Sequence, residues 1–392
     1  MDEAVSAQQE SVTKTAKPYP KYRWWVQALA VALVAATFVL VAIGGHVTST
    51  DAGMSVPDGF TTFGVWSLIA PLETWWYQSD TRLEHGHRLK GYVVGWLSIG
   101  LLVALLLTQG RRRWLKGLGV GLLVFVVIQG VMGILRVDEV SLVLAGVHGV
   151  TGQVFLCLTV LAAAAVGRRW MAVGRAKASE RGSITTTPGG SVRWLPVLLL
   201  AALLLQLSLG SAVRHGQAAL AIPDWPMHYG EVLPPMSQGE IDRAVAAVPA
   251  DQRPERFAPA RVDEQGVKQA GTYAPWQVHV HLSHRVMGYT IFVLGVLFVA
   301  WLVKRYADRP AVLVPAGVFL VALCLQVLLG VMTVLSGEHA TLATSHQTVG
   351  AVLFASATWL TVRLHLVPRP AALPTEATQP AAAAYPREAR PA

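Results

Sequence analysis

The chain has 392 residues, of which 53% are hydrophobic and only 14% are charged. This composition places it among integral membrane proteins and excludes an ordinary soluble domain. The net charge of +9 does not require nucleic acid as a partner, because Lys and Arg collect in the loops on one side of a membrane protein and attract anionic lipid headgroups.

Eight apolar runs are long enough to cross a bilayer, which takes about 20 residues in a helix. In chain order we expect them near 25–45, 88–108, 116–136, 141–166, 194–213, 284–303, 311–334 and 341–363. The expected fold class is therefore an all-α integral membrane protein with eight transmembrane helices.

The distribution of Lys and Arg predicts the orientation of these helices. About two thirds of the 32 basic residues lie in the N-terminus, the C-terminus and every second loop, and such a surplus marks the cytoplasmic side. Both termini are therefore expected in the cytoplasm, and the long loops 46–86 and 214–280 are expected outside.

The chain also contains an internal repeat. Residues 44–64 align without gaps to residues 210–230, so that Pro57-Asp58 falls on Pro223-Asp224. Further blocks match at a spacing of 197 or 198 residues: His87-Arg88 with His284-Arg285, Gln129 and Gly133 with Gln326 and Gly330, and His148 with His346. The repeat predicts two duplicated four-helix bundles of the same orientation, at 23–167 and 194–365.

The segments outside these bundles are expected to carry no site. Residues 1–22 and 366–392 are polar or rich in Pro and Ala, so we expect disordered tails. Residues 168–193 are expected to form a cytoplasmic linker. Residues 231–280 hold a charged outer insertion with room for a short surface helix.

Four histidines occupy matched places in the repeat: His87, His148, His284 and His346. We expect each to begin a span at the same shallow depth below the outer face. An ionisable residue in a membrane is costly unless it is paired or bound, and facing histidines on separate helices commonly hold heme iron. The four are therefore predicted metal ligands of two hemes, with zinc as the alternative, although its sites are compact clusters.

The copies differ at an acid, since Glu84 precedes His87 where His281 precedes His284. If the helix already includes Glu84, its carboxyl shares a face with His87. It could then exchange a proton or stabilise a developing cation beside a heme, or simply interact with the helix dipole. Arg88 and Arg285 could pair with heme propionates or reach lipid phosphates.

The motifs GG-x-VTS, GxSVPD and EHGHR, the later histidine and the repeat ending HR…H resemble the heme A synthase family over about residues 25–365. The resemblance implies oxidation of a methyl group of heme O to the formyl group of heme A for terminal oxidases. It implies a catalytic site of Glu84, His87 and His148 in a substrate bundle, 23–167. It also implies heme b on His284 and His346, with Arg88 and Arg285 as further cofactor-binding residues.

The same resemblance implies the cellular setting. The protein is expected in the inner (plasma) membrane, with the lipid bilayer, heme O synthase, a terminal oxidase and an electron-transfer protein as partners, no nucleic acid, and heme sites near the outer face.

The chain departs from the family pattern in two places. It lacks the cysteine pair that one branch carries in an outer loop, which excludes a thiol role in electron delivery. Pro57-Asp58-Gly59 also lacks the tryptophan of Pro223-Asp224-Trp225, which predicts a changed loop on the substrate side. Two other functions fit the residues: a diheme b-type electron-transfer protein, and a heme-binding chaperone without conversion.

Overall fold

The computed structural model describes residues 19–110, 112–179, 194–258, 261–262, 268–269 and 271–366. Nearly all of the expected tails, 1–22 and 366–392, lies outside these residues, as does the 180–193 part of the expected linker.

Eight helices of the described residues are long and apolar enough to cross a membrane. They are α2 (Trp24–Ser49), α4 (Ser79–Thr108), α5 (Arg113–Asp138), α6 (Leu142–Ala165), α8 (Leu195–His215), α10 (Pro275–Arg305), α11 (Pro310–Leu335) and α12 (Ala340–Leu366). Large apolar side chains such as Leu107 and Leu198 are exposed on their outer sides, as expected of helices surrounded by lipid. The predicted all-α membrane fold is confirmed.

Two helices begin well before the apolar run that predicted them. Helix α4 begins at Ser79 rather than near 88, and α10 begins at Pro275 rather than near 284. Their first turns carry helix-start signals, since Asp80 lies in the first turn of α4 and proline suits the first position of α10. His87 and His284 therefore lie about two turns inside their helices, so the prediction that they begin the helices was wrong.

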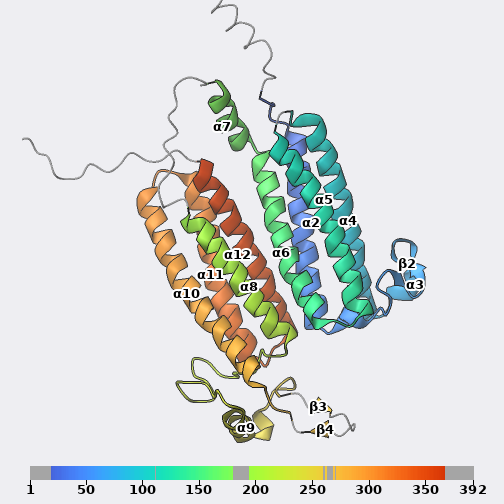
Figure 1. Ribbon diagram of the computed structural model, residues 1–392, viewed down its shortest axis with the longest axis vertical. Helices are drawn as coiled ribbons and strands as arrows, with labels where there is room; N and C mark the ends of the chain where they lie inside the picture. Colours follow the sequence, from blue (N-terminus) through green and yellow to red (C-terminus); the bar gives the residue numbers. More distant parts are fainter. Residues whose placement is uncertain are drawn as a thin grey trace, which may run out of the picture.

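The eight helices form two groups that stand side by side (Figure 1). The first group consists of α2, α4, α5 and α6, and the second of α8, α10, α11 and α12. Helices α2 and α6 contact α12, and α6 also contacts α8. Each group has its own buried core, for example Leu33, Leu101 and Leu122 in the first and Leu302, Phe319 and Leu360 in the second.

The loops 50–78 and 216–274 lie at one end of the helices, which we call the loop face. The first loop contains η1 (Ala52–Met54), a hairpin of β1 (Thr61–Thr62) and β2 (Val65–Trp66), η2 (Ser67–Ile69) and α3 (Leu72–Trp75). Trp75 stacks on His85 at 4.2 Å between ring centroids, and Thr62 Oγ1 lies 2.9 Å from His85 Nδ1. These contacts hold the first loop against α4.

The second loop forms a small folded unit under the second group (Figure 1). It contains α9 (Gln238–Ala247), η4 (Ala250–Gln252) and the paired strands β3 (Arg261–Val262) and β4 (Lys268–Gln269). Ile222, Ile241, Phe257 and Tyr273 form its core. At the start of α9 the Glu240 carboxylate accepts the Ser237 backbone N–H at 3.0 Å, which is half of a capping box.

The expected linker 168–193 begins with a helix that the sequence did not predict, α7 (Arg168–Ser179). It lies at the end of the molecule opposite the loop face (Figure 1).

Candidate functional site

A cavity of about 870 Å³ lies among the helices and is lined by residues of both groups. This volume is within the range of small-molecule and cofactor pockets, roughly 300–1,000 Å³. All four predicted histidines line it, from α4, α6, α10 and α12. The loop face is the nearer end for each of them, because all four lie within the first three turns of helices that begin there.

The second pair of histidines has the geometry of two ligands to one metal ion. The ring centroids of His284 and His346 are 6.3 Å apart, and their planes make an angle of 77°. An imidazole nitrogen binds a metal at roughly 2 Å, so an ion held between two rings would separate their centres by roughly 6 Å. The Nδ1 atom of His346 lies 3.0 Å from the carbonyl oxygen of Gln326, which makes Nε2 the nitrogen that could bind a metal, although the side-chain amide of Gln326 now stands 3.3 Å from it.

The other imidazoles carry buried nitrogens that lack partners. The Nδ1 atoms of His87, His148 and His284 are buried without a hydrogen bond to any described residue. A buried polar group without a partner is costly, so these atoms indicate positions that a bound group would complete. The spacing of the second pair fits one iron porphyrin, and the unpartnered Nδ1 atoms of His87 and His148 leave the same kind of ligation open to the first pair.

Each histidine packs against a glycine of a neighbouring helix. An added Cβ at Gly44 would lie 2.8 Å from Cε1 of His87, and one at Gly210 would lie 2.9 Å from Cε1 of His284. The matching distances are 3.4 Å from Gly133 to His148 and 2.9 Å from Gly330 to His346. The sequence signal was present in the repeat, since both glycine pairs align, but the analysis of residue types alone gave them no role.

Two glutamines distinguish the second pair from the first. Gln206 Nε2 lies 3.4 Å from His284 Nε2, and Gln326 Nε2 lies 3.3 Å from His346 Nε2. In the first group the counterpart of Gln206 is Leu40, and Gln129 donates instead to Thr151 Oγ1 at 2.6 Å. The two halves of the cavity therefore offer different surroundings to their histidines.

Glu84 lies on the same helix as His87, three residues before it, and only 2% of its surface is exposed. Its carboxylate accepts hydrogen bonds from Ser55 Oγ at 3.1 Å and from the backbone N–H of Val56 at 2.8 Å. Arg88 Nη2 forms an ion pair with it at 2.7 Å. In the second group the neutral partner of Arg285 is His281, whose Nε2 accepts from Arg285 Nε at 3.1 Å.

Arg88 and Arg285 hold the loops onto the helices. Arg88 donates to the backbone carbonyls of Val56, Asp58 and Thr61 as well as to Glu84. Arg285 donates to the carbonyl of Ile222 at 2.7 Å. Arg88 thus uses four of the five N–H groups of an arginine within the protein. The predicted contact between Arg88 and a heme propionate stays a prediction.

The two Pro-Asp motifs build the same turn. Asp58 Oδ2 accepts the N–H of Gly64 at 2.7 Å, and Asp224 Oδ2 accepts the N–H of Gly230 at 2.7 Å. Both glycines have a left-handed backbone, with φ of 80° and 78°, which glycine adopts without steric cost.

The first loop makes a Trp–Tyr contact like that of the second loop, although Gly59 stands where the second loop has Trp225. An added Cβ at Gly59 would lie 2.6 Å from Asp138 Oδ1 and 2.8 Å from Ile134 Cγ2, so no tryptophan fits there. In the second loop Trp225 Nε1 donates to Tyr289 Oη at 2.9 Å. In the first loop Trp66 Nε1 donates to the matching Tyr92 Oη at 3.2 Å, from a different position along the chain.

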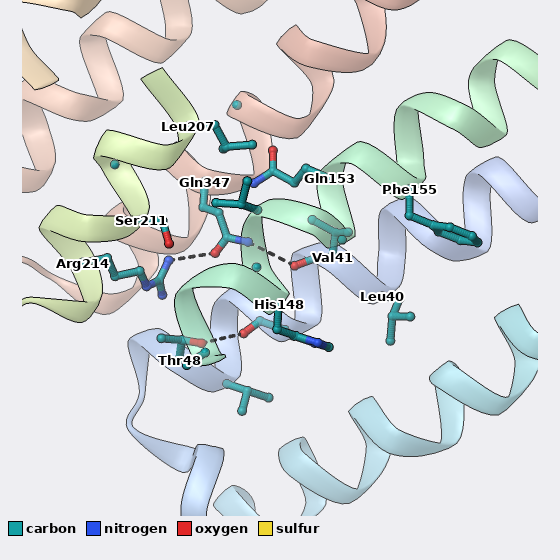
Figure 2. Close-up of a pocket in the computed structure, with 18 of the residues that line it drawn as sticks. Leu40, Val41, Thr48, His148, Gln153, Phe155, Leu207, Ser211, Arg214 and Gln347 are labelled. Atoms are coloured by element: carbon teal, nitrogen blue, oxygen red, sulfur yellow. Dashed lines mark hydrogen bonds between the residues drawn. The ribbon is translucent and has the colours of Figure 1, made fainter. Parts of the chain in front are cut away.

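A polar network joins the two groups of helices beside the cavity (Figure 2). Arg214 of α8 donates to Gln347 Oε1 of α12 at 2.7 Å, to the carbonyl of Gly45 at 2.7 Å and to Ser49 Oγ. Gln347 in turn donates to the carbonyl of Val41 at 3.3 Å. Arg214 was not predicted as a functional residue, because it directly follows the expected span 194–213 and begins the expected outer loop 214–280.

Arg136 is a second cavity-lining cation that the sequence analysis missed. It lies near the end of α5 and donates to the carbonyl of Gly53 at 3.2 Å, while its counterpart in the repeat is Thr333. Among the described residues no group of three or more His, Cys, Asp or Glu is placed to hold a metal ion.

Comparison with known proteins gives one family model and relatives that share one name. A family model described as cytochrome oxidase assembly protein, COX15-CtaA, matches residues 27–358. A heme A synthase of Cereibacter sphaeroides is 27% identical over 368 residues, covering 84% of each chain. Heme A synthases of Methylobacterium radiotolerans and Symbiobacterium thermophilum are 28% and 30% identical, covering 86% and 54% of this chain and 88% and 66% of their own.

Proposed function

Because the chain belongs to the COX15-CtaA family of cytochrome oxidase assembly proteins, we propose that it is a membrane oxidoreductase converting heme O to heme A. The reaction oxidises a porphyrin methyl group to a formyl group in support of terminal oxidase assembly. The relatives named heme A synthase, similar over 84% of the chain or more, support this assignment.

The observation that carries the proposal is Glu84, which among the described residues is the one acid in the fully buried class and which stands beside one of the two matched histidine pairs. Glu84 stands next to His87 in the first half of the cavity, and the second half has His281 in its place. We assign the first half to the substrate, heme O, and the second half to heme b. The 6.3 Å separation of the His284 and His346 ring centroids suits a permanently bound iron porphyrin.

In this assignment His87 and His148 hold the iron of heme O, and His284 and His346 hold that of heme b. When bound, heme iron would supply the oxidising chemistry, and heme b would supply a route by which the electrons removed from the methyl group leave toward the electron-transfer partner. Glu84 is positioned by Arg88, Ser55 and Val56, and the lone pairs left on its oxygens can accept a proton or stabilise positive charge at the reacting carbon. The surrounding apolar helices exclude water, which strengthens these electrostatic interactions.

The cellular setting is proposed on the same basis. Eight membrane-spanning helices and the positions of the basic loops support a multi-pass protein of the inner (plasma) membrane with cytoplasmic termini. The loop face and the heme sites would then lie toward the outside. Heme O synthase, a terminal oxidase and an electron-transfer protein are the partners that this reaction requires.

The test is the heme content of the protein produced together with a supply of heme O. Wild-type protein is expected to yield heme A and heme b. Glu84→Gln, which removes the charge at nearly constant volume, should lower formation of heme A about 100-fold or more while heme b is retained. Glu73→Gln, an exposed acid of the first loop, is the matched control and should behave as wild type.

Three outcomes would contradict these assignments. Two equivalents of heme b with no heme O or heme A would favour the electron-transfer alternative. Heme O bound without conversion would favour the chaperone. Unchanged formyl production in Glu84→Gln would remove Glu84 from the reaction.

A further inference from the structure

We propose that the first half of the cavity opens sideways between α4 and α5 into the lipid, and that this opening holds the isoprenoid chain of heme O. The opening is the slot lined by Gly91, Gly95 and Gly130. The inference deepens the proposed function and rests on it, because it names where the apolar chain of that substrate binds.

Exposure shows where the cavity reaches the outer surface. Trp96 and Ile99 of α4 and Val127 and Val131 of α5 line the cavity, yet they are 66%, 39%, 59% and 49% exposed. A side chain can line a cavity and face outward only at the rim of an opening. All four lie inside membrane-spanning helices, so this opening faces lipid.

The glycines keep the slot open. An added Cβ at Gly91, Gly95 or Gly130 would meet no atom within 4 Å. These glycines therefore do not serve close packing of α4 on α5, in contrast to Gly119, where a Cβ would lie 3.0 Å from Leu105.

The internal repeat provides the comparison. The second-half counterparts of Gly91, Gly95 and Gly130 are Gly288, Phe292 and Val327. A Cβ at Gly288 would lie 3.2 Å from Gln206, and Phe292 packs against the core of the second group. The counterparts of the four rim residues are Val293, Val296, Cys324 and Leu328, and none of these described residues lines the cavity.

The chemistry of the slot fits an apolar chain. Its rim consists of Trp, Ile and Val, and Trp96 lies nine residues beyond His87, or roughly 13 Å further along the helix. That depth is well inside the span, away from the interfacial belt where tryptophan is usual. Heme O carries a long isoprenoid chain and heme b does not, which matches an opening in the first half and its closure in the second.

The test transfers the second-half residues into the slot. Gly95→Phe and Gly130→Val are made separately, in protein whose second half is already loaded with heme b. Heme O and heme b are then titrated as probes into the first half and followed by their absorption spectra. Gly121→Val is the matched control, because Gly121 is exposed on α5 with open space around it and does not line the cavity.

We expect each slot variant to weaken heme O binding about tenfold or more, since loss of contact with as few as two methylene groups has that effect. The affinity of the first half for heme b should change by less than about twofold. On a free-energy scale that is roughly a third of the change that corresponds to a tenfold difference in affinity. Retention of heme b in the second half reports that each variant is folded. Gly121→Val should leave both affinities unchanged.

Equal losses for both probes, no loss for either, or an equal effect of Gly121→Val would each overturn the proposal. The binding is read without turnover, so its failure is distinct from failure of the proposed function. Wild-type protein that binds heme O through the slot but never forms heme A would refute the reaction and leave the slot intact.

Discussion

Each candidate ligand lies against a glycine, and the small size of that glycine fixes where the imidazole can sit. Gly210 on α8 is one of two equally close cases in the second half, with an added Cβ 2.9 Å from Cε1 of His284, as at Gly330 and His346. The ring cannot yield without leaving its place opposite His346. The position of the imidazole ring is thus set by a residue with no side chain.

We expect Gly210→Val to lose bound heme b. The added isopropyl group, whose Cβ alone would lie 2.9 Å from the ring, overpacks the site, which costs about 1–3 kcal/mol and turns His284 away from the metal. The measurement is heme b per protein from the absorption spectrum. Gly317→Val on α11, where no atom lies within 4 Å of the added Cβ, should keep its heme, and full retention in Gly210→Val would contradict the expectation.

At this scale the sequence predicted the histidines and the acid that line the cavity, and it missed the glycines that pack against the histidines. Histidines and an acid in a membrane span are conspicuous by type, and the repeat pairs them. Gly44 is separated from His87 by more than forty residues, and only the packing of α2 on α4 brings them together. The type of a residue does not show which residue of another helix it will contact.

At the scale of elements, hydropathy predicted that the helices exist but not where two of them begin. The segment 79–87 is polar, and 275–283 mixes polar with apolar residues, so neither belongs to the apolar run that follows it, yet they form the first turns of α4 and α10 as regular helix. Their polar side chains bind the loops: His85 contacts Thr62, Glu84 contacts Val56, and Gln277 donates to the carbonyl of Gly216 at 2.8 Å.

The turn at Asp58 makes the first loop sensitive to acid. The N–H of Gly64 and the hydroxyl of Thr61 lower the pKa of Asp58 from its ordinary value of 3.8. The ionised Asp58 carboxylate therefore stabilises the turn fully above the ordinary aspartate pKa. This stabilisation is lost as the pH falls through the lower pKa that Asp58 has in the folded protein.

We expect Asp58→Ala to speed hydrogen exchange at the Gly64 amide near pH 7, because the acceptor of that N–H is removed. The ratio between variant and wild type should approach one as the pH drops below the ordinary range of an aspartate. Asp251→Ala, an exposed acid in the second loop, should leave the Gly64 amide unchanged. A ratio independent of pH would contradict the role of the ionised carboxylate.

At the scale of the whole molecule, the repeat predicted two four-helix groups, but it could not predict how they meet. The meeting surface uses α2 and α6 from the first group and α8 and α12 from the second. Arg214 is the counterpart of Thr48 in the repeat, so its bonds to Gly45 and Gln347 break the equivalence of the halves. The cavity is lined by residues of both groups, so it forms only where the groups meet. The sequence of either half alone does not predict it.

We expect Arg214→Met to weaken the contact between the groups. The variant leaves the carbonyl of Gly45 and the amide of Gln347 without their charged donor, and such hydrogen bonds are worth about 1.5–3 kcal/mol each. The measurement is the unfolding temperature in detergent, with Arg243→Met on the exposed side of α9 as the control. Equal unfolding temperatures for the two variants would contradict a structural role for Arg214.

Tyr92 of α4 and Tyr289 of α10 each accept a hydrogen bond from a tryptophan of the adjoining loop. The donor is Trp66 in the first half and Trp225 in the second. An alignment of the two halves therefore shows no aromatic residue at Gly59. The hydrogen bond to the tyrosine is nevertheless made, by a tryptophan at a different position in the loop. Conservation in such a duplicated protein is better judged by which atoms touch than by which letters coincide. By that standard the apparent defect in the first motif is a relocation.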